Sequence, residues 1–292
     1  MARPPAADDH RPVLVTSPDG LHLAVHDLGG DGPPLLLSHA TGFHGYVYAP
    51  LAAALSDRFH CWAMDHRGHG SSERPTTDLG DWDRFTADVL AVSEALGLDQ
   101  AIGFGHSMGG TALLMAERAR PRTFAGLVVF EPIAFPHDPA RADGPSMMVA
   151  GARRRRAVFA SRQEAYDNYA GKPPLDALTP EALRAYVDHG FLDRPDGSVE
   201  LACQPEQEAS VFEGGARQDA FAHLGEVPCP VLVMAGTPDE NPPGMVAPAI
   251  AQALAHGRLH VFPGLTHFGP MQDPAAVARE IVAFADEVLP RG

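Results

Sequence analysis

The sequence predicts an α/β fold in which a mostly parallel, doubly wound sheet carries an inserted helical cap. Short, fully apolar runs alternate with helical patterns along most of the 292 residues, and this order is typical of parallel strands connected by helices. The alternation stops between about residues 133 and 224, where only helical and loop-like patterns occur. A chain of this length accommodates one large domain with an insertion of that size.

The first predicted element is a β-hairpin at residues 13–29, where "VLVTSPDGLHLAVHDLG" alternates apolar and polar side chains around Asp19-Gly20. Parallel strands are predicted for the apolar runs "PLLLSH", "HCWAMD", "AIGFGH", "GLVVFE", "CPVLVMAG" and "GRLHVFPG". Helices are predicted between them, in "YAPLAAALSD", "FTADVLAVSEALG", "GGTALLMAERA" and "DPAAVAREIVAFADEVL". We expect these helices to lie on both sides of the sheet.

The cap is predicted from the helical patterns "GARRRRAVFASRQEAYDNYA" and "TPEALRAYVDHG" and from the turn signals that separate them. This insertion follows a core strand and precedes two more, so we expect it to cover the carboxyl edge of the sheet. The predicted parts of the chain are a polar tail at 1–12, a core at 13–132 and 225–292, and a cap at 133–224.

Charged and aromatic residues of the cap are expected to pack between helices or to face solvent. The arginines at 153–156 are consecutive, so in a helix they cannot share one face, and we expect a solvated surface. Tyr186, His189, Glu206 and Glu208 could line a pocket, but helix packing and exposure are the expectation.

The composition excludes several classes of function. The formal net charge is −15, and such a surface repels nucleic acid and anionic lipid. No apolar run approaches the roughly 18 residues of a membrane span, and the first residues lack the apolar core of a signal peptide. The 3 cysteines are widely spaced, which argues against a disulfide framework. We therefore expect a cytoplasmic protein with a small-molecule substrate and no nucleic-acid or membrane partner, and the sequence leaves the oligomeric state open.

One serine stands among glycines, in "GHSMG" at residues 105–109. An apolar strand pattern precedes it and a helical pattern follows, the setting in which a strained turn lifts a serine hydroxyl above the edge of a sheet. The N–H of Met108 would lie at the start of that helix, where it can stabilise a developing oxyanion. The alternative is an ordinary glycine-rich turn, but a dinucleotide-binding Gly-x-Gly-x-x-Gly pattern fails at Met108.

A serine nucleophile needs a general base and a carboxylate that orients the base. Asp239 follows a buried strand in "VLVMAGTPDENPP", and His267 lies after the last strand in "VFPGLTHFGPMQDP". Both residues are expected at the same edge of the sheet as Ser107. Glu131, at the end of "GLVVFE", occupies a third strand end.

These segments, together with "MDHRGHGSS", resemble the α/β-hydrolase fold superfamily over residues 13–132 and 226–288. The resemblance implies Ser107 as nucleophile, His267 as general base and Asp239 as the acid. Glu131 is the alternative acid, because in some relatives, notably haloalkane dehalogenases, the acid follows that strand. Since Asp239 fills the commoner position, we expect Glu131 to orient a neighbouring loop.

The segment "LLLSHATGFHG" resembles the family's His-Gly-x segment, which supplies part of the oxyanion hole. The resemblance implies the backbone N–H of Thr41 as the second donor beside that of Met108. Ala40 stands where glycine is commoner, so the loop could differ in shape. Three histidines near these segments are candidates for substrate contact: His39, His44 and His106.

The predicted function is cleavage of a small, largely apolar ester through an acyl-enzyme intermediate, without a cofactor. His66 and His69 have metal-like spacing beside Asp65, but no further ligands support a metal site. The same triad also serves lactone or enol-lactone hydrolases, thioesterases, carbon–carbon bond hydrolases and cofactor-free haloperoxidases, so these alternatives remain open. A ligand-binding receptor on a hydrolase scaffold is the alternative from another class.

Overall fold

The computed structural model describes residues 11–136, 138, 146–237 and 242–289. Within these residues, eight strands form one sheet in the order β1-β2-β4-β3-β5-β6-β10-β11. Only the pairs β1–β2 and β2–β4 are antiparallel, so the predicted mostly parallel sheet is confirmed. The strands are β1 (Val13–Thr16), β2 (His22–Asp27), β3 (Pro34–Ser38), β4 (His60–Met64), β5 (Ala101–His106), β6 (Phe124–Phe130), β10 (Val231–Ala235) and β11 (Gly257–Val261).

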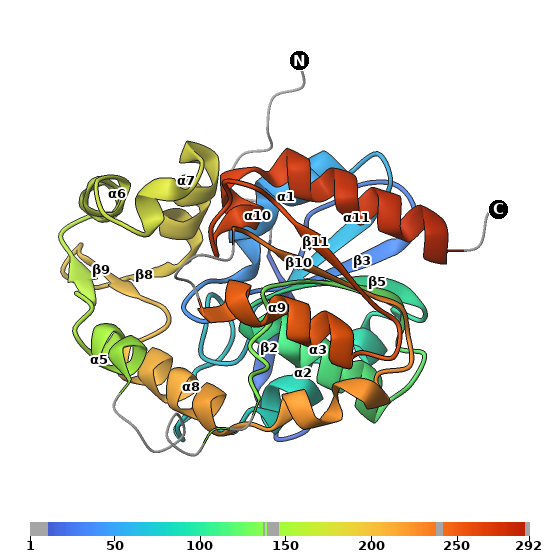
Figure 1. Ribbon diagram of the computed structural model, residues 1–292. Coiled ribbons are helices and arrows are strands. Elements are labelled where there is room, and N and C mark those ends of the chain that lie inside the picture. Colours follow the sequence, from blue (N-terminus) through green and yellow to red (C-terminus); the bar gives the residue numbers. More distant parts are fainter. Residues whose placement is uncertain (1–10, 137, 139–145, 238–241, 290–292) are drawn as a thin grey trace.

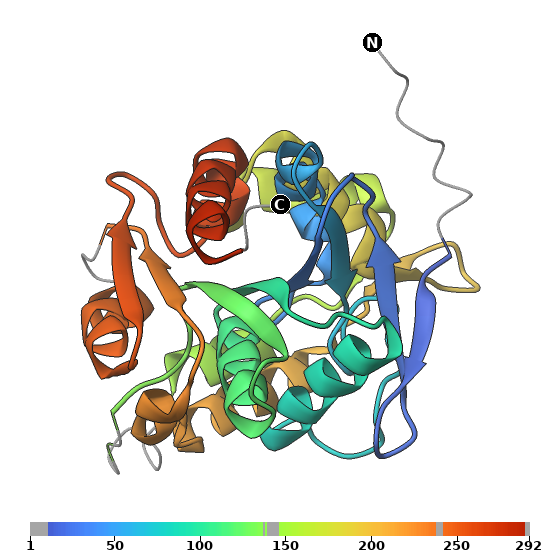
Figure 2. The same cartoon turned by 90° about the vertical axis from the view of Figure 1, so that its right-hand side faces the viewer.

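Two layers of helices cover the two faces of this sheet (Figure 2). One layer contains α1 (Ala49–Leu55), α10 (Gly269–Gln272) and α11 (Pro274–Val288), and the other contains α2 (Asp83–Ala95), α3 (Met108–Ala119), α9 (Pro242–Ala253) and η3 (Ala220–Glu226). The inner strands β3, β5, β6 and β10 are almost wholly buried, whereas the edge strands β1 and β11 are mostly exposed. This burial explains why the inner parallel strands are continuously apolar in sequence.

Between β6 and β10 the chain forms a second, smaller unit beside the sheet (Figure 1). We call the described residues 146–217 the cap segment. Its helices are α5 (Met147–Arg153), α6 (Arg162–Ala170), α7 (Pro180–His189) and α8 (Pro205–Arg217), with the short turn η2 (Leu175–Ala177). A three-stranded sheet of β7 (Val158–Phe159), β9 (Val199–Leu201) and β8 (Phe191–Asp193) joins them. The sequence analysis did not predict these strands.

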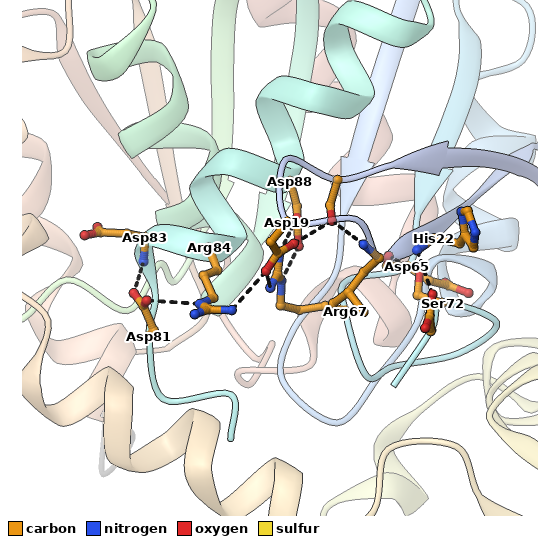
Figure 3. A network of polar contacts seen from close by, with 12 residues as sticks. Asp19, His22, Asp65, Arg67, Ser72, Asp81, Asp83, Arg84 and Asp88 are labelled. Atoms are coloured by element: carbon orange, nitrogen blue, oxygen red, sulfur yellow. Dashed lines mark hydrogen bonds and ion pairs between the residues drawn. The ribbon is translucent and has the colours of Figure 1, made fainter. Parts of the chain in front are cut away.

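The predicted hairpin is present, and an arginine ties it to the loop that follows β4. The side chain of Arg67 is 2% exposed, and its guanidinium binds Asp88 of α2 at 2.6 Å and Asp19 of the hairpin turn at 2.8 Å. Figure 3 shows this network, in which the exposed Arg84 also reaches Asp19. The buried guanidinium of Arg67 therefore fixes the loop after β4 both to the hairpin turn and to α2.

Among the described residues, no helix is long and apolar enough to cross a bilayer.

Candidate active site

Ser107 stands between β5 and α3 in a backbone conformation that L-residues rarely adopt, with φ 55° and ψ −120°. The turn leaves no room for a side chain at the two glycines that lie two residues before and after the serine. A Cβ at Gly105 would lie 2.5 Å from the Cα of Gly110, and one at Gly109 would lie 2.3 Å from the carbonyl oxygen of Ser38. The glycines of "GHSMG" are thus required by backbone contact, and the turn stores strain at the serine.

His267 and Glu131 meet at the carboxyl edge of the sheet. Nδ1 of His267 lies 2.6 Å from Oε2 of Glu131. The other carboxylate oxygen accepts a hydrogen bond from the backbone N–H of Gly236 at 2.9 Å. Glu131 is fully buried and has a φ of 45°, so its backbone is also strained. These contacts give Nδ1 of His267 a carboxylate partner directly after β6, the strand next to β5, which Ser107 follows.

Asp239, predicted from the sequence as the acid, lies outside the described residues. Its predicted role therefore stays a prediction. Glu131 does bind a neighbouring loop, as expected, through the N–H of Gly236. Its second contact, with His267, corresponds to the role of the acid, for which Asp239 was preferred from the sequence.

The two expected oxyanion donors belong to segments that touch each other. Within the described residues, the N–H groups of Thr41 and Met108 have no hydrogen-bond acceptor. Met108 is the first residue of α3, where the free N–H groups and the helix dipole favour a negative charge. Gly109 packs on the carbonyl groups of Ser38 and His39, at the start of the loop that carries Thr41. The arrangement suits the binding of an oxyanion.

A layer of neutral histidines supports this loop, residues 39–45, which we call the oxyanion loop. His39 accepts a hydrogen bond from the N–H of His66 at 2.9 Å, and His69 accepts one from the N–H of Gly42 at 3.2 Å. Burial holds the pKa of His39 well below its ordinary value and lowers that of His66 to about 3. The rings therefore remain neutral acceptors at ordinary pH.

A buried carboxylate fixes the far end of the oxyanion loop. Asp65 accepts a hydrogen bond from the N–H of Gly45 at 2.7 Å and lies 2.9 Å from His26. Burial works to raise the pKa of Asp65, but the interactions with His26, His44 and His39 together outweigh burial, and the pKa lies below its ordinary value. His44 bonds the carbonyl group of Tyr186 through Nε2 at 3.2 Å, and burial lowers its pKa to about 4.

The histidines suggested for substrate contact lie beneath the site, not in it. His39, His44 and His106 are buried, and none of them lines the cavity that contains Ser107. His106 instead bonds the hydroxyl group of Tyr48 at 2.8 Å. Each ring is held by backbone or hydroxyl groups behind the oxyanion loop or the serine turn, so the expectation of substrate contact is corrected. In the part of the chain that the structure describes, no group of three or more metal-ligating side chains is present.

A cavity of about 430 Å³ opens above Ser107 and His267. Most of its wall is apolar and comes from both the core and the cap segment. The core contributes Ala40, Thr41, Gly42, Phe43, Ser107, His267 and Phe268, and the cap segment contributes Met147, Met148, Arg155, Tyr169, Leu175, Tyr186, Glu208 and Phe212, among others. Tyr186 and Glu208 thus do line a pocket, although the sequence analysis favoured packing and exposure.

The arginine run divides between surface and cavity. Helix α5 ends at Arg153, whose side chain is 44% exposed and binds Glu206 at 2.8 Å. Two residues later the chain has turned inward, and Arg155 is 20% exposed in the cavity wall. The prediction of a solvated helix surface is therefore wrong for Arg155, because the helix ends before it.

The chain matches a protein-family model over most of its length. The model of the "Alpha/beta hydrolase family" matches residues 35–280. The chain belongs to the α/β-hydrolase family. This α/β hydrolase is 29% identical over 279 residues to a non-heme chloroperoxidase of Streptomyces lividans, covering 92% of this chain and 98% of the relative.

Two further similarities cover nearly the whole α/β hydrolase. It is 29% identical over 271 residues to 2-(acetamidomethylene)succinate hydrolase of Mesorhizobium japonicum, covering 88% of this chain and 89% of the relative. The crystal structure of an E-2-(acetamidomethylene)succinate hydrolase superposes with a TM-score of 0.81 at 23% identity, covering 95% of this chain and 99% of that chain. At this identity the superposition shows the shared fold.

Proposed function

We propose that this α/β hydrolase is a serine hydrolase that cleaves a small, largely apolar ester through an acyl-enzyme intermediate. The observation that carries the proposal is the pairing of His267 with a buried carboxylate, Glu131, in a cavity that also contains the strained Ser107. A base, a carboxylate that orients it and a serine at a strand–helix turn are the parts that acyl transfer needs.

In the proposed reaction, Nε2 of His267 takes the proton of Ser107 as its Oγ attacks the ester carbonyl carbon. Glu131 accepts the Nδ1–H of the imidazole and stabilises the imidazolium, so we assign the acid role to Glu131 in preference to Asp239. The N–H groups of Met108 and Thr41 bind the tetrahedral oxyanion. The imidazolium then protonates the leaving alcohol, and a water molecule hydrolyses the acyl-enzyme in a second attack of the same kind.

The cavity supports a small substrate with an apolar acyl or alcohol part. Its volume of about 430 Å³ is near the lower end of the range for ligand sites, roughly 300–1,000 Å³. Phe43, Phe212 and Phe268 contribute aromatic faces to the wall. Burial of an apolar acyl chain against them supplies binding free energy of about 25 cal/mol per Å².

Replacement of the nucleophile tests the proposal. We expect Ser107→Ala to abolish covalent labelling by a fluorophosphonate probe and turnover of p-nitrophenyl esters, because the proposed acyl-enzyme forms on the Ser107 hydroxyl. Circular dichroism and the thermal midpoint should remain close to those of the parent chain. A parent chain that neither labels nor turns over esters, lactones or thioesters would contradict the proposal and favour a ligand receptor.

The similarity to a non-heme chloroperoxidase favours a second candidate, peroxide-dependent turnover of the same acyl-enzyme. Hydrogen peroxide would replace water as the nucleophile, forming a peroxy acid and regenerating the Ser107 hydroxyl. We expect acetate and hydrogen peroxide to give peracetic acid only with an intact Ser107. Equal peracid formation by Ser107→Ala would exclude this candidate.

A further inference from the structure

An ion pair of the cap segment, with a nearly buried carboxylate and a partly exposed guanidinium, lies directly against the oxyanion loop. Nη1 of Arg155 and Oε2 of Glu208 are 2.5 Å apart, and the Glu208 side chain is 9% exposed. The second oxygen, Oε1, lies 2.5 Å from the point where a Cβ of Gly42 would stand, and Nη1 of Arg155 lies 3.3 Å from that point. The carboxylate therefore occupies the space that a side chain at Gly42 would fill.

Two tyrosines hold the arginine in this orientation. Nη2 of Arg155 donates to the hydroxyl group of Tyr186 at 2.5 Å and to that of Tyr169 at 3.4 Å. Tyr186 itself contacts the oxyanion loop, because its carbonyl group bonds His44 at 3.2 Å and its ring centroid lies 5.2 Å from that of Phe43. Arg155 is thus fixed at both of its terminal nitrogens.

Gly42 is also held by the core, through its backbone N–H. Its N–H donates to His69 at 3.2 Å, and Nδ1 of His69 bonds the carbonyl group of Arg67 at 2.9 Å. Gly42 has a φ of 77° and follows Thr41, the expected oxyanion donor. The loop therefore lies between a histidine of the core and a carboxylate of the cap segment.

We propose that Arg155 and Glu208 are positioning residues, through which the cap segment holds the Thr41 N–H in the geometry of the oxyanion hole. The inference rests on the proposed function. Attachment of α5 to α8 does not require this pair, because the buried side chains of Val149, Ala152 and Ala209 already pack the two helices together. The Glu208 carboxylate, at 9% exposed, also loses most of its hydration, a cost that attachment of the helices does not explain. Contact with Gly42 explains this burial, because the carboxylate then holds the loop that carries the Thr41 N–H.

The test compares Arg155→Met with a matched control, Arg153→Met. Arg155→Met leaves the Glu208 carboxylate without its cation beside the oxyanion loop, and we expect kcat to fall about tenfold or more. That loss is smaller than the roughly 10²–10³ for deletion of an oxyanion donor itself. Arg153→Met removes exposed pairs with Glu206 and Glu213 of the same helix, α8, away from the oxyanion loop, so we expect kcat to change less than about twofold.

The pattern across substrates separates positioning from pocket shape. A positioning role predicts the same fold-loss in kcat for p-nitrophenyl acetate and for longer acyl chains, with KM little changed, and an equal loss in the rate of labelling by a small fluorophosphonate. If Arg155 only shapes the acyl pocket, the loss will grow with chain length and the acetate and the probe will be spared, which would overturn the proposal.

A second variant keeps the test decisive if Arg155→Met does not fold. Glu208→Gln preserves the shape of the side chain and removes its charge, and we expect a smaller loss with the same independence of chain length. Full activity of folded Glu208→Gln on every ester would overturn the proposal. Because each comparison uses a parent chain that labels at Ser107, failure of the parent would instead count against the proposed function.

Discussion

At the scale of single residues, the carboxylate beside His267 determines which imidazole tautomer is present. Glu131 contacts Nδ1 at 2.6 Å, and an amide there would favour the wrong tautomer while preserving the shape. We expect Glu131→Gln to lower kcat by about 10⁴, as a comparable substitution does in another serine hydrolase. Steady-state kinetics with p-nitrophenyl acetate would measure the effect, with the thermal midpoint as a check on folding.

Asp239→Asn is the matched variant, with an expected loss of less than about tenfold on the same argument. The reverse order of the two losses would show that Asp239 is the acid. Two mild single variants and an inactive double variant would show that the carboxylates substitute for one another.

The roles of Ser107 and His267 could be proposed from the sequence because local patterns mark a strand–turn–helix and a strand end. The choice between Glu131 and Asp239 could not be made in the same way. It depends on sheet order: β6 lies between β5 and β10, and only the folded sheet places the end of β6 beside the His267 loop. The complete burial of Glu131 at a strand end is likewise a property of the folded sheet, which the sequence does not show.

At the scale of elements, the pairing of Arg67 with Asp88 fixes the loop after β4 to α2 (Figure 3). Removal of the Asp88 charge leaves the buried Arg67 guanidinium with the partly exposed Asp19 as its remaining partner. We expect Asp88→Asn to lower the free energy of unfolding by up to roughly 3–5 kcal/mol, measured by urea denaturation.

Arg84→Ala is the control for this prediction, because Arg84 binds the same Asp19 from an exposed position. Exposed pairs contribute about 0–1 kcal/mol, so the urea midpoint should change little. Equal losses in the two variants would show that burial of the pair is not what makes it important.

The long elements were predictable and the short ones were not. The hairpin and the apolar strands repeat a pattern over enough residues to be recognised, and the structure contains them. Strands β7, β8 and β9 have only two or three residues, too few to show alternation. The inward position of Arg155 was missed for a related reason, since it depends on where α5 ends rather than on the arginine run itself.

At the scale of the whole molecule, the neutral histidines make stability depend on pH. His44 has a pKa lowered to about 4 and His66 one lowered to about 3, chiefly by burial. In the unfolded chain both bind a proton near pH 6.5. The unfolded state therefore takes up more protons as the pH falls, and stability is complete above about pH 6.5 and declines below it.

We expect the free energy of unfolding to fall on the order of 3 kcal/mol between about pH 7 and pH 4 for His44 alone, since one pKa unit corresponds to 1.36 kcal/mol. Asp65 adds little to the loss in this window. Its pKa is lowered in the fold, so its contribution is lost only as the pH falls below the ordinary carboxyl pKa of about 3.9, at the lower end of the range. Urea denaturation across this range would measure the slope, and His44→Gln should reduce it. A slope that is unchanged in the variant would contradict the assignment.

The close approach of Gly109 to the carbonyl groups of Ser38 and His39 has a consequence for how new specificities could evolve in this protein. The separation between the two halves of the proposed oxyanion hole is set by backbone atoms in contact, so no side-chain substitution can widen it gradually. A Cβ at this position would instead force the two segments apart. Variation in substrate range therefore falls to the cavity-lining side chains that do not hold the oxyanion loop, such as Phe212 and Phe268, which can change one at a time while the chemistry stays constant.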